Sequence, residues 1–282
     1  MILVLGAGGH VGTPLVEDLA ARGARFRAGY RTADRAAAAE RLGAETVLLD
    51  YLDADSLDRA MAGVERLFLV APPVENLEQL ERAVVEAAIR NGVPYLVKLS
   101  VWDARTGDFI FGRPHRAIEE LVERSGLAWT FLRPNGFMQN LLASAPLIRQ
   151  SGVHPFPEGG RVSWVDARDV GRAAAAVLTG SGHEGRAYEL SGPERLGYAD
   201  QIRIVSEVTG RDYAYVPLPD EEWRRAALGA GLPPYLVNAL VDLQRYQRKG
   251  HTDHIADGVE RLTGAQPTTF RRFVEDHVEA FR

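Results

Sequence analysis

The sequence predicts an α/β fold built on a doubly wound parallel sheet. In the first half of the chain, short apolar runs alternate with Ala-, Leu- and Glu-rich stretches of helical composition. The apolar runs show little polar alternation, which is typical of parallel strands buried on both faces. Glycines follow the helical stretches at the points where helices end. Strands and helices that alternate at this spacing imply right-handed crossovers and a doubly wound sheet.

The individual elements follow from the same patterns. We expect strands at residues 2–5, 25–30, 45–49, 66–70, 94–99 and 128–132. We expect helices near residues 11–22, 33–42, 55–62, 76–91 and 113–125. Beyond residue 134 we expect a short helix, a Gly- and Pro-rich loop at 151–160 that resembles a pocket lid, and one more strand and helix within 161–179. A helix-rich tail completes the chain.

Composition excludes several classes of function. The 282 residues carry 33 basic and 38 acidic side chains, a net charge of −5, so the basic surface of a nucleic-acid binder is absent. The chain has no cysteine, which excludes disulfides, thiolate nucleophiles and zinc–thiolate or iron–sulfur sites. No apolar run approaches the roughly 18–20 residues of a membrane span, and the apolar start is too short for a signal peptide. We therefore expect a cytoplasmic monomer or homodimer whose partner is a small molecule, without nucleic-acid or membrane partners.

A glycine-rich turn is the strongest motif in the chain. The run GAGGHVG occupies residues 6–12, directly after the first strand and at the start of the first helix. Glycine suits this turn because the backbone there must approach a pyrophosphate closely, and the helix N-terminus offers free N–H groups to the anion. The alternative is a purely structural turn. The context predicts a dinucleotide site that includes Gly6, Gly8, Gly9, His10 and Val11.

The end of the second strand indicates which dinucleotide is bound. NAD enzymes place an acid there for the ribose 2′-hydroxyl, about twenty residues past the glycines. This strand instead ends in Gly-Tyr-Arg-Thr, which places Arg31 where a 2′-phosphate would lie. A guanidinium matches phosphate geometry and stays charged. We therefore expect NADP(H); the alternative for Arg31 is a solvated arginine at the start of a helix.

Three further strand ends offer candidate cofactor contacts. Asp50 follows the third strand and could accept from the adenine amino group, whereas Asp53 or Asp55 could cap the following helix. Val70, Ala71 and Pro72 form a stiff turn after the fourth strand. Lys98 ends the fifth apolar run, where either a cofactor contact or a surface position is open to it.

With these motifs in place, the chain resembles the NmrA-like family of atypical short-chain dehydrogenases, in particular its NADPH:quinone oxidoreductase-like branch. The resemblance covers nearly the whole chain and rests on GAGGHVG (6–12), GVERLFLVAPP (63–73), KLS (98–100), VDARDVGRAAAAVL (165–178), YELSGPE (188–194) and, most specifically, SGLAWTFLRPNGFMQN (125–140). It implies an extended Rossmann fold over residues 1–134, to which 161–180 return, and a smaller, mostly helical C-terminal substrate lobe over 135–282.

The same resemblance implies further site residues. Besides the glycine turn, Arg31 and the turn at 70–72, it places Pro134, Gly136 and Phe137 near the nicotinamide. It also suggests a substrate pocket lined by Trp102, Asn135, Asn140, Phe156 and Trp164.

One departure from the family pattern concerns catalysis. Extended short-chain dehydrogenases carry a Tyr-x-x-x-Lys pair in which the tyrosine donates a proton to the substrate oxygen. The matching stretch here runs from Phe111 to His115, so both residues are replaced, while Ser100 matches the usual active-site serine. His115 is a candidate general acid because its reference pKa lies near neutrality; the alternative is a helix-start packing residue.

The expected function is hydride transfer from NADPH to a quinone-like or other conjugated, electron-poor small molecule, for which protonation is easy. Two alternatives stay open: a non-enzymatic NADP(H) sensor, and a cyclase or isomerase that reuses the pocket. No metal site is expected, since His251 and His254 alone do not make one.

Overall fold

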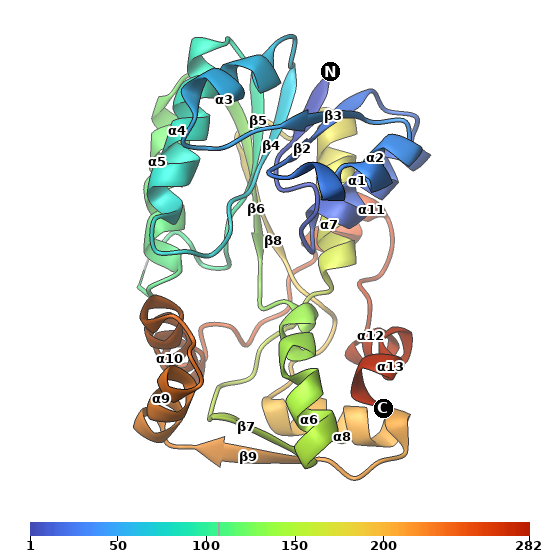
Figure 1. Ribbon diagram of the computed structural model, residues 1–282, viewed down its shortest axis with the longest axis vertical. Coiled ribbons are helices and arrows are strands. Elements are labelled where there is room, and N and C mark those ends of the chain that lie inside the picture. Colours follow the sequence, from blue (N-terminus) through green and yellow to red (C-terminus); the bar gives the residue numbers. More distant parts are fainter. Residues whose placement is uncertain (107) are drawn as a thin grey trace.

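Seven parallel strands of the described chain form one sheet, which organises the molecule (Figure 1). The computed structural model describes residues 1–106 and 108–282, with the side chain of Asp34 left out. The strand order is β3-β2-β1-β4-β5-β6-β8, and all neighbouring pairs are parallel. This order reverses direction between β1 and β4. A doubly wound sheet binds ligands at such a switch point, beyond the carboxyl ends of its strands.

The predicted strands and helices of the first half are confirmed to within about two residues. The strands are β1 (Ile2–Val4), β2 (Phe26–Tyr30), β3 (Glu45–Leu48), β4 (Arg66–Leu69), β5 (Tyr95–Leu99), β6 (Ala128–Pro134) and, in the second half, β8 (Arg186–Leu190). The helices between them are α1 (Gly12–Ala21), η1 (Ala33–Arg35), α2 (Ala37–Arg41), α3 (Ala54–Met61), α4 (Leu77–Arg90) and α5 (Gly112–Arg124).

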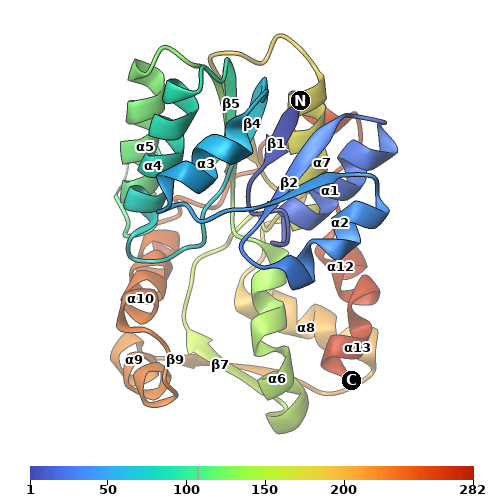
Figure 2. The same cartoon turned by 45° about the horizontal axis from the view of Figure 1, so that its top comes forward.

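The sheet is buried on both faces, as the apolar runs predict. Leu3 and Leu5 belong to one core cluster together with α3, α4 and α5, whereas Ile2 and Val4 belong to a second cluster together with α1 and α7 (Ala167–Thr179). Figure 2 shows these two helix layers on opposite sides of the strands. β3 is the exception, because it is an edge strand whose Leu48 is exposed.

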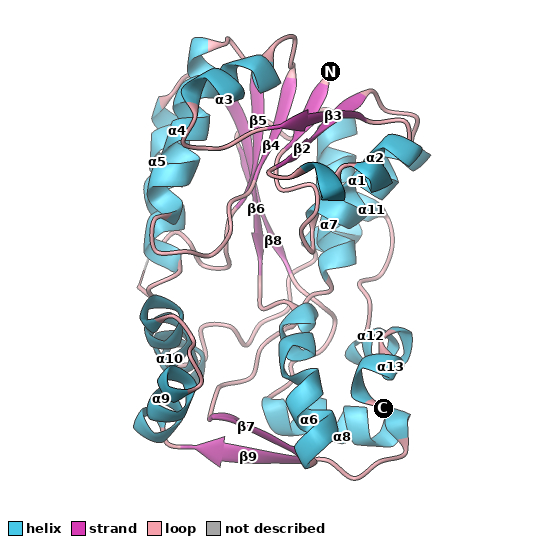
Figure 3. Ribbon diagram, in the orientation of Figure 1, coloured by secondary structure: helices cyan, strands magenta, loops and turns pink. Residues whose placement is uncertain are grey.

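The second half of the chain builds a smaller group of elements below the carboxyl ends of the strands (Figure 3). It contains η2 (Met138–Ser144), α6 (Ala145–Ser151), β7 (Val153–Pro157), α8 (Tyr198–Thr209), β9 (Ala214–Leu218), α9 (Asp220–Gly229), α10 (Pro234–Arg248), α12 (Phe270–Asp276) and α13 (Val278–Phe281). Three elements of this half, α7, β8 and α11 (Gly258–Thr263), instead pack with the sheet layer.

Two predictions for this half are wrong. The stretch 151–160 is not a lid loop, because β7 lies within it and pairs in parallel with β9. The strand predicted before α7 is absent from the described residues, where Val162 and Val165 form only isolated bridges. The helix predicted there is confirmed as α7, capped by the carboxylate of Asp166. No helix within residues 1–106 and 108–282 has the length and apolar character that a membrane crossing needs.

Helix α7 packs against α1 so closely that a side chain does not fit at Gly171. A Cβ there would lie 2.9 Å from the Leu15 nitrogen and 3.0 Å from Pro14 Cγ. Gly229, at the end of α9, has open space around it.

We expect these two helical glycines to respond oppositely to substitution. Gly171→Ala should lower the free energy of unfolding by about 1–3 kcal/mol, because the backbone of α1 must move. Gly229→Ala should raise it by about 0.5–1 kcal/mol, because alanine favours the helix and meets nothing. Urea denaturation measures both, and equal effects would contradict the described packing of α1 on α7.

Candidate cofactor and active site

The predicted cofactor residues lie together at the carboxyl edge of the sheet. The glycine turn follows β1, Arg31 follows β2, Asp50 follows β3, Val70–Pro72 follow β4 and Gly136–Phe137 follow β6. In Figure 1 this edge faces the group of elements formed by the second half of the chain. The topology therefore brings distant parts of the sequence to one place, as a dinucleotide site requires.

The glycine turn has the geometry of an anion cradle. Gly6 has a φ of +62°, and a Cβ on it would lie 2.6 Å from Val70 Cγ1, while a Cβ on Gly12 would lie 2.1 Å from the Gly6 carbonyl oxygen. Gly8, Gly9 and His10 are exposed at the tip of the turn.

Free donors open this turn toward a ligand. Within the described residues, the N–H groups of His10, Val11 and Gly12 donate to no backbone carbonyl, while the Gly9 N–H closes the turn on Gly6 at 2.9 Å. Free donors at the N-terminus of a ten-residue helix fit a pyrophosphate.

Two arginines flank the turn. Arg31 is exposed just past the end of β2. The aliphatic part of Arg35, in η1, lies over the turn, since its Cδ would be 3.5 Å from a Cβ on Gly8, beside the Tyr30 ring at the same distance. The sequence prediction named Arg31 as the 2′-phosphate ligand; the structure adds the side chain of a second arginine, Arg35, over the glycine turn.

Of the strand-end residues next to the turn, some make hydrogen bonds that stabilise the fold, and one is exposed and could contact a cofactor. Tyr51 donates to the Val70 carbonyl at 2.7 Å and so fixes the turn after β4. Asp53 caps α3 through the N–H groups of Asp55 and Ser56, which confirms the capping alternative for this residue. Asp50 is exposed and accepts from the Leu52 N–H at 2.9 Å, and its contact with adenine stays a prediction.

Lys98 is neither at the surface nor free to reach a cofactor. Its side chain is 0% exposed and forms an ion pair with Glu81 of α4, which is also 0% exposed. Its ammonium also donates to the Leu99 carbonyl at 3.2 Å and to Nδ1 of His115 at 3.1 Å. All three donors are thereby occupied, so we no longer expect a direct cofactor contact.

His115 lies in the first turn of α5 against this ion pair. Burial, and secondarily the Lys98 ammonium, hold the pKa of His115 well below its usual range. Burial also raises the pKa of Glu81, against the opposing effect of Lys98. An imidazole with so low a pKa is neutral at pH 7. The near-neutral pKa that suggested a general acid therefore does not apply to this buried imidazole, and a catalytic role for His115 stays a prediction.

Ser100 belongs to a second buried network. Its hydroxyl donates to Glu119 Oε1 at 2.7 Å, and Glu119 forms two hydrogen bonds to Arg133 of β6, at 2.9 and 2.6 Å. All three side chains are buried, with Glu119 at 0% exposure. The Ser100 proton therefore points into the network, and it would have to leave Glu119 before it could serve a substrate.

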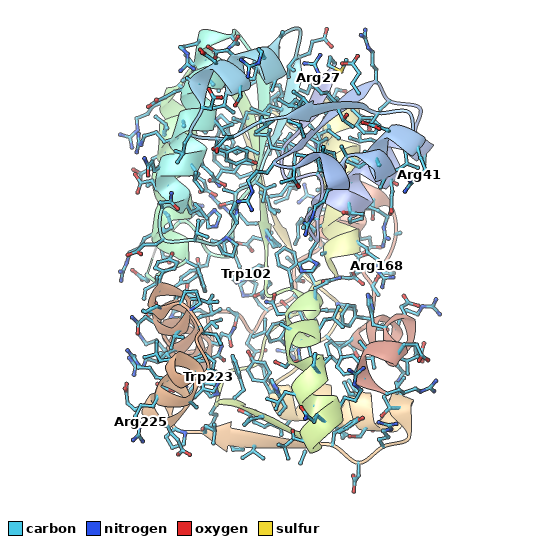
Figure 4. The ribbon with its side chains drawn as sticks, in the orientation of Figure 1. Arg27, Arg41, Trp102, Arg168, Trp223 and Arg225 are labelled. Carbon is cyan, nitrogen blue, oxygen red and sulfur yellow. The ribbon has the colours of Figure 1, made fainter. Side chains whose placement is uncertain are left out.

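Trp102 joins the sheet edge to the second half of the chain (Figure 4). Its backbone N–H donates to the Pro134 carbonyl at 2.8 Å, and its indole donates to the His251 carbonyl at 3.0 Å. The ring is nearly buried and lies 4.4 Å from the His254 ring. These contacts fix the position of the Trp102 side chain, which is predicted to line the substrate pocket.

The predicted pocket residues after β6 are also held by hydrogen bonds. The Asn135 amide donates to Ser163 Oγ at 2.9 Å and to the Thr252 carbonyl at 3.0 Å, and its oxygen accepts from the Gly136 N–H. The Trp164 ring packs on Gly136, where a Cβ would lie 2.7 Å from it. The hydrogen-bonding groups of Asn135 are therefore largely used within the protein. Trp164 packs against the loop that carries Phe137.

The two remaining pocket candidates lie on η2 and on β7. Asn140 is exposed on η2. Phe156, on β7, packs with Tyr198, Trp223 and His154 at centroid distances of 5.0 to 5.4 Å. Burial among these rings lowers the pKa of His154 to about 4. Phe156 thus belongs to the aromatic core of the second lobe, and its contact with a substrate stays a prediction.

Comparison with known proteins places the chain in a family. The model of the NmrA-like family matches residues 1–275. The chain belongs to the NmrA-like family. The predicted family and the predicted Rossmann-like sheet are confirmed.

Three relatives of this NmrA-like chain are similar over their whole length. A (4-alkanoyl-5-oxo-2,5-dihydrofuran-3-yl)methyl phosphate reductase from Streptomyces griseus is 40% identical, with 100% of this chain and 99% of that protein covered. An NAD(P)H azoreductase from Xenophilus azovorans is 35% identical, with the same coverage. The solved structure of the NADPH-dependent quinone oxidoreductase QOR2 from Escherichia coli in complex with NADPH has a TM-score of 0.91 and 28% identity, with 99% of this chain and 100% of that chain covered.

Several side chains of the NmrA-like site were beyond sequence reasoning. Glu81, Glu119 and Arg133 lie within stretches whose charges suggested ordinary helix surface or a strand end. The available signal was weak: Glu81 and Glu119 fall on the helix faces that also carry buried Val84, Val85 and Ile118. Within the described ranges, no group of three or more His, Asp or Glu side chains is arranged to hold a metal ion, and His254 instead contacts Trp102 and Glu189.

The buried Glu119–Arg133 pair should dominate the stability of this edge. Glu119→Gln should lower the free energy of unfolding by about 3–5 kcal/mol, because Arg133 is left buried without its counter-ion. The neighbouring Glu120→Gln is the matched control: Glu120 pairs with Arg116 and Arg124 at the surface, and its loss should cost less than about 1 kcal/mol. Urea denaturation measures both, and a small effect of Glu119→Gln would refute the buried network.

Proposed function

We propose that this chain is an NADPH-dependent reductase that transfers hydride to a quinone-like or other conjugated, electron-poor small molecule. The observation that carries the proposal is the carboxyl edge of the sheet. There a glycine turn with free N–H donors and two arginines adjoin side chains that have no acidic proton to offer. This combination supports a reaction that needs cofactor placement but little acid catalysis.

The chain's own residues account for cofactor binding. The N–H groups of His10 to Gly12 would hold the pyrophosphate, with the positive end of the α1 dipole behind them. Arg31, supported by Arg35, would bind the 2′-phosphate. Val70 and Ala71 would line the ribose. When bound, the cofactor supplies a hydride; the protein supplies orientation and the exclusion of water.

The proposed class of acceptor follows from the proton donors that the site lacks. Phe111 has no hydroxyl, the Ser100 proton is directed to Glu119, and His115 is neutral. An isolated ketone becomes a strongly basic alkoxide on reduction and needs an acid close by, whereas a quinone gives a weakly basic oxygen that water protonates. The site therefore suits acceptors that delocalise the incoming electron pair.

The relatives support the same class of acceptor. An azo group, a quinone and an alkanoyl-substituted oxodihydrofuran each contain an electron-poor π bond that can accept a hydride. Their common feature is an acceptor that is poor in electrons. We propose this class of acceptor for the present chain, and not the particular substrate of any one relative. The acceptor would lie between the sheet edge and the lobe formed by residues 135–282, against Trp102 and Trp164.

A panel of acceptors tests the proposal. NADPH oxidation is measured with quinones, azo dyes, enones and an isolated ketone. We expect turnover with conjugated acceptors and none with the ketone. Tight NADPH binding without turnover on any of them would overturn the reductase and favour the sensor alternative, for which different affinities for NADP⁺ and NADPH are the diagnostic.

Cofactor preference provides a separate prediction. Arg31→Ala should weaken NADPH binding roughly ten- to a hundredfold and leave NADH binding nearly unchanged, because a charge-assisted contact worth on the order of 1.5–3 kcal/mol is lost. Arg41→Ala, on the outer helix α2, is the control and should change neither. Fluorescence titration measures the affinities, and equal losses for both nucleotides would show that Arg31 does not bind the 2′-phosphate.

A further inference from the structure

We propose that Lys98 is a positioning residue that fixes His115 as its Nε2–H tautomer, so that His115 presents a neutral N–H donor to the acceptor. The tautomer is inferred from the apoprotein alone. Its use in catalysis rests on the proposed function. In this arrangement His115 donates a hydrogen bond and keeps its proton. The buried Lys98–Glu81 pair orients the His115 ring.

The direction of the hydrogen bond between the two residues is not free. An ammonium has three N–H donors and no acceptor. Lys98 directs one donor to Glu81, one to the Leu99 carbonyl and one to Nδ1 of His115, 3.1 Å away. Nδ1 must therefore be the unprotonated nitrogen of the ring. A neutral imidazole carries one N–H, so the proton is on Nε2.

Burial keeps this arrangement in place. Lys98 and Glu81 are both 0% exposed, so neither side chain can turn to water without breaking the pair. Protonation of Nδ1 would set an imidazolium against the Lys98 ammonium. The nearest acid on the same helix, Glu119, is committed to Arg133 of β6 and to Arg116. Glu81 is the remaining carboxylate, and its hydrogen bond is made to Lys98 and not to His115.

Nε2 lies on the accessible side of the ring. It makes no hydrogen bond to any residue of the described chain, and it is not among the buried polar atoms that lack a partner. His115 is itself only half-buried. Because α5 follows the carboxyl end of β5, its first turn stands at the edge of the sheet where the cofactor residues gather. Nε2–H is therefore placed for an acceptor atom at that edge.

The reaction balances without a proton from His115. The acceptor gains a hydride, which is one hydrogen nucleus with two electrons, from the cofactor, which is oxidised. The negative charge that develops on the acceptor oxygen or nitrogen is stabilised by the Nε2–H hydrogen bond. A water molecule then donates the single proton that the reaction needs to that atom, and the resulting hydroxide takes a proton from the buffered solvent. His115 keeps its proton throughout.

Nitrogen-15 NMR of the histidine-labelled full chain, without cofactor, tests the tautomer directly. We expect a pyridine-type Nδ1 and a pyrrole-type Nε2 for His115, both unchanged between pH 5 and 8; His115→Gln assigns the signals by their loss. In the charge-neutral double variant Lys98→Met with Glu81→Gln, which removes the N–H donor to Nδ1, His115 should populate both tautomers. A wild-type His115 that titrates between pH 5 and 8, or that carries its proton on Nδ1, overturns the proposal, even where the double variant does not fold.

Kinetics then test the use of the donor. Loss of one neutral hydrogen bond should lower kcat about three- to tenfold in His115→Leu, whereas His115→Gln, which retains a side-chain N–H, should keep more of the turnover. The wild-type pH profile should show no His115 step. Equal losses in both variants would overturn the donor role. Absence of turnover in the wild type would overturn the proposed function and leave the NMR result standing.

Discussion

Two charged side chains in the core of the sheet, Lys98 and Arg133, need buried carboxylate partners, and the arrangement of the active-site end follows from this need. Lys98 of β5 draws in Glu81 of α4, and Arg133 of β6 draws in Glu119 of α5. A buried charge without its partner is strongly destabilising, so the two pairs fix both helices against the strands. His115 and Ser100 take their orientations from these pairs and not from solvent.

The strands of the sheet could be predicted from the sequence, whereas those of the second lobe could not, and the difference has a physical reason. Strands buried on both faces leave an apolar run that is readable without knowledge of their partners, as in β1, β4 and β5. β7 contains two prolines and one histidine, and β9 contains one proline. These two strands are defined mainly by their pairing with each other, which local composition does not reveal. The apolar run VSWV predicted a strand that the described residues do not form. Its composition suits a strand, but its neighbours pair with it only through isolated bridges.

The candidate site divides in the same way. The places of the glycine turn and of Arg31 at the sheet edge could be predicted because they depend on the local backbone and on the strand order; their contacts with a cofactor stay a prediction. The roles of His115 and Ser100 could not, because they depend on Lys98 and Glu119, which approach only after the helices pack. A reference pKa describes an isolated imidazole; burial beside an ammonium reverses the conclusion drawn from it. The missing acid group is therefore consistent with acceptors that need none.

A crystal structure of this protein with NADP⁺ bound tests the account most directly. The account predicts the pyrophosphate on the N–H groups of His10 to Gly12, the 2′-phosphate against Arg31, and the nicotinamide C4 on the side of the sheet edge reached by Nε2 of His115. It also predicts that Lys98 stays paired with Glu81 and touches no atom of the cofactor. A nucleotide bound away from the glycine turn, or a Lys98 released from Glu81 onto the ribose, would contradict it.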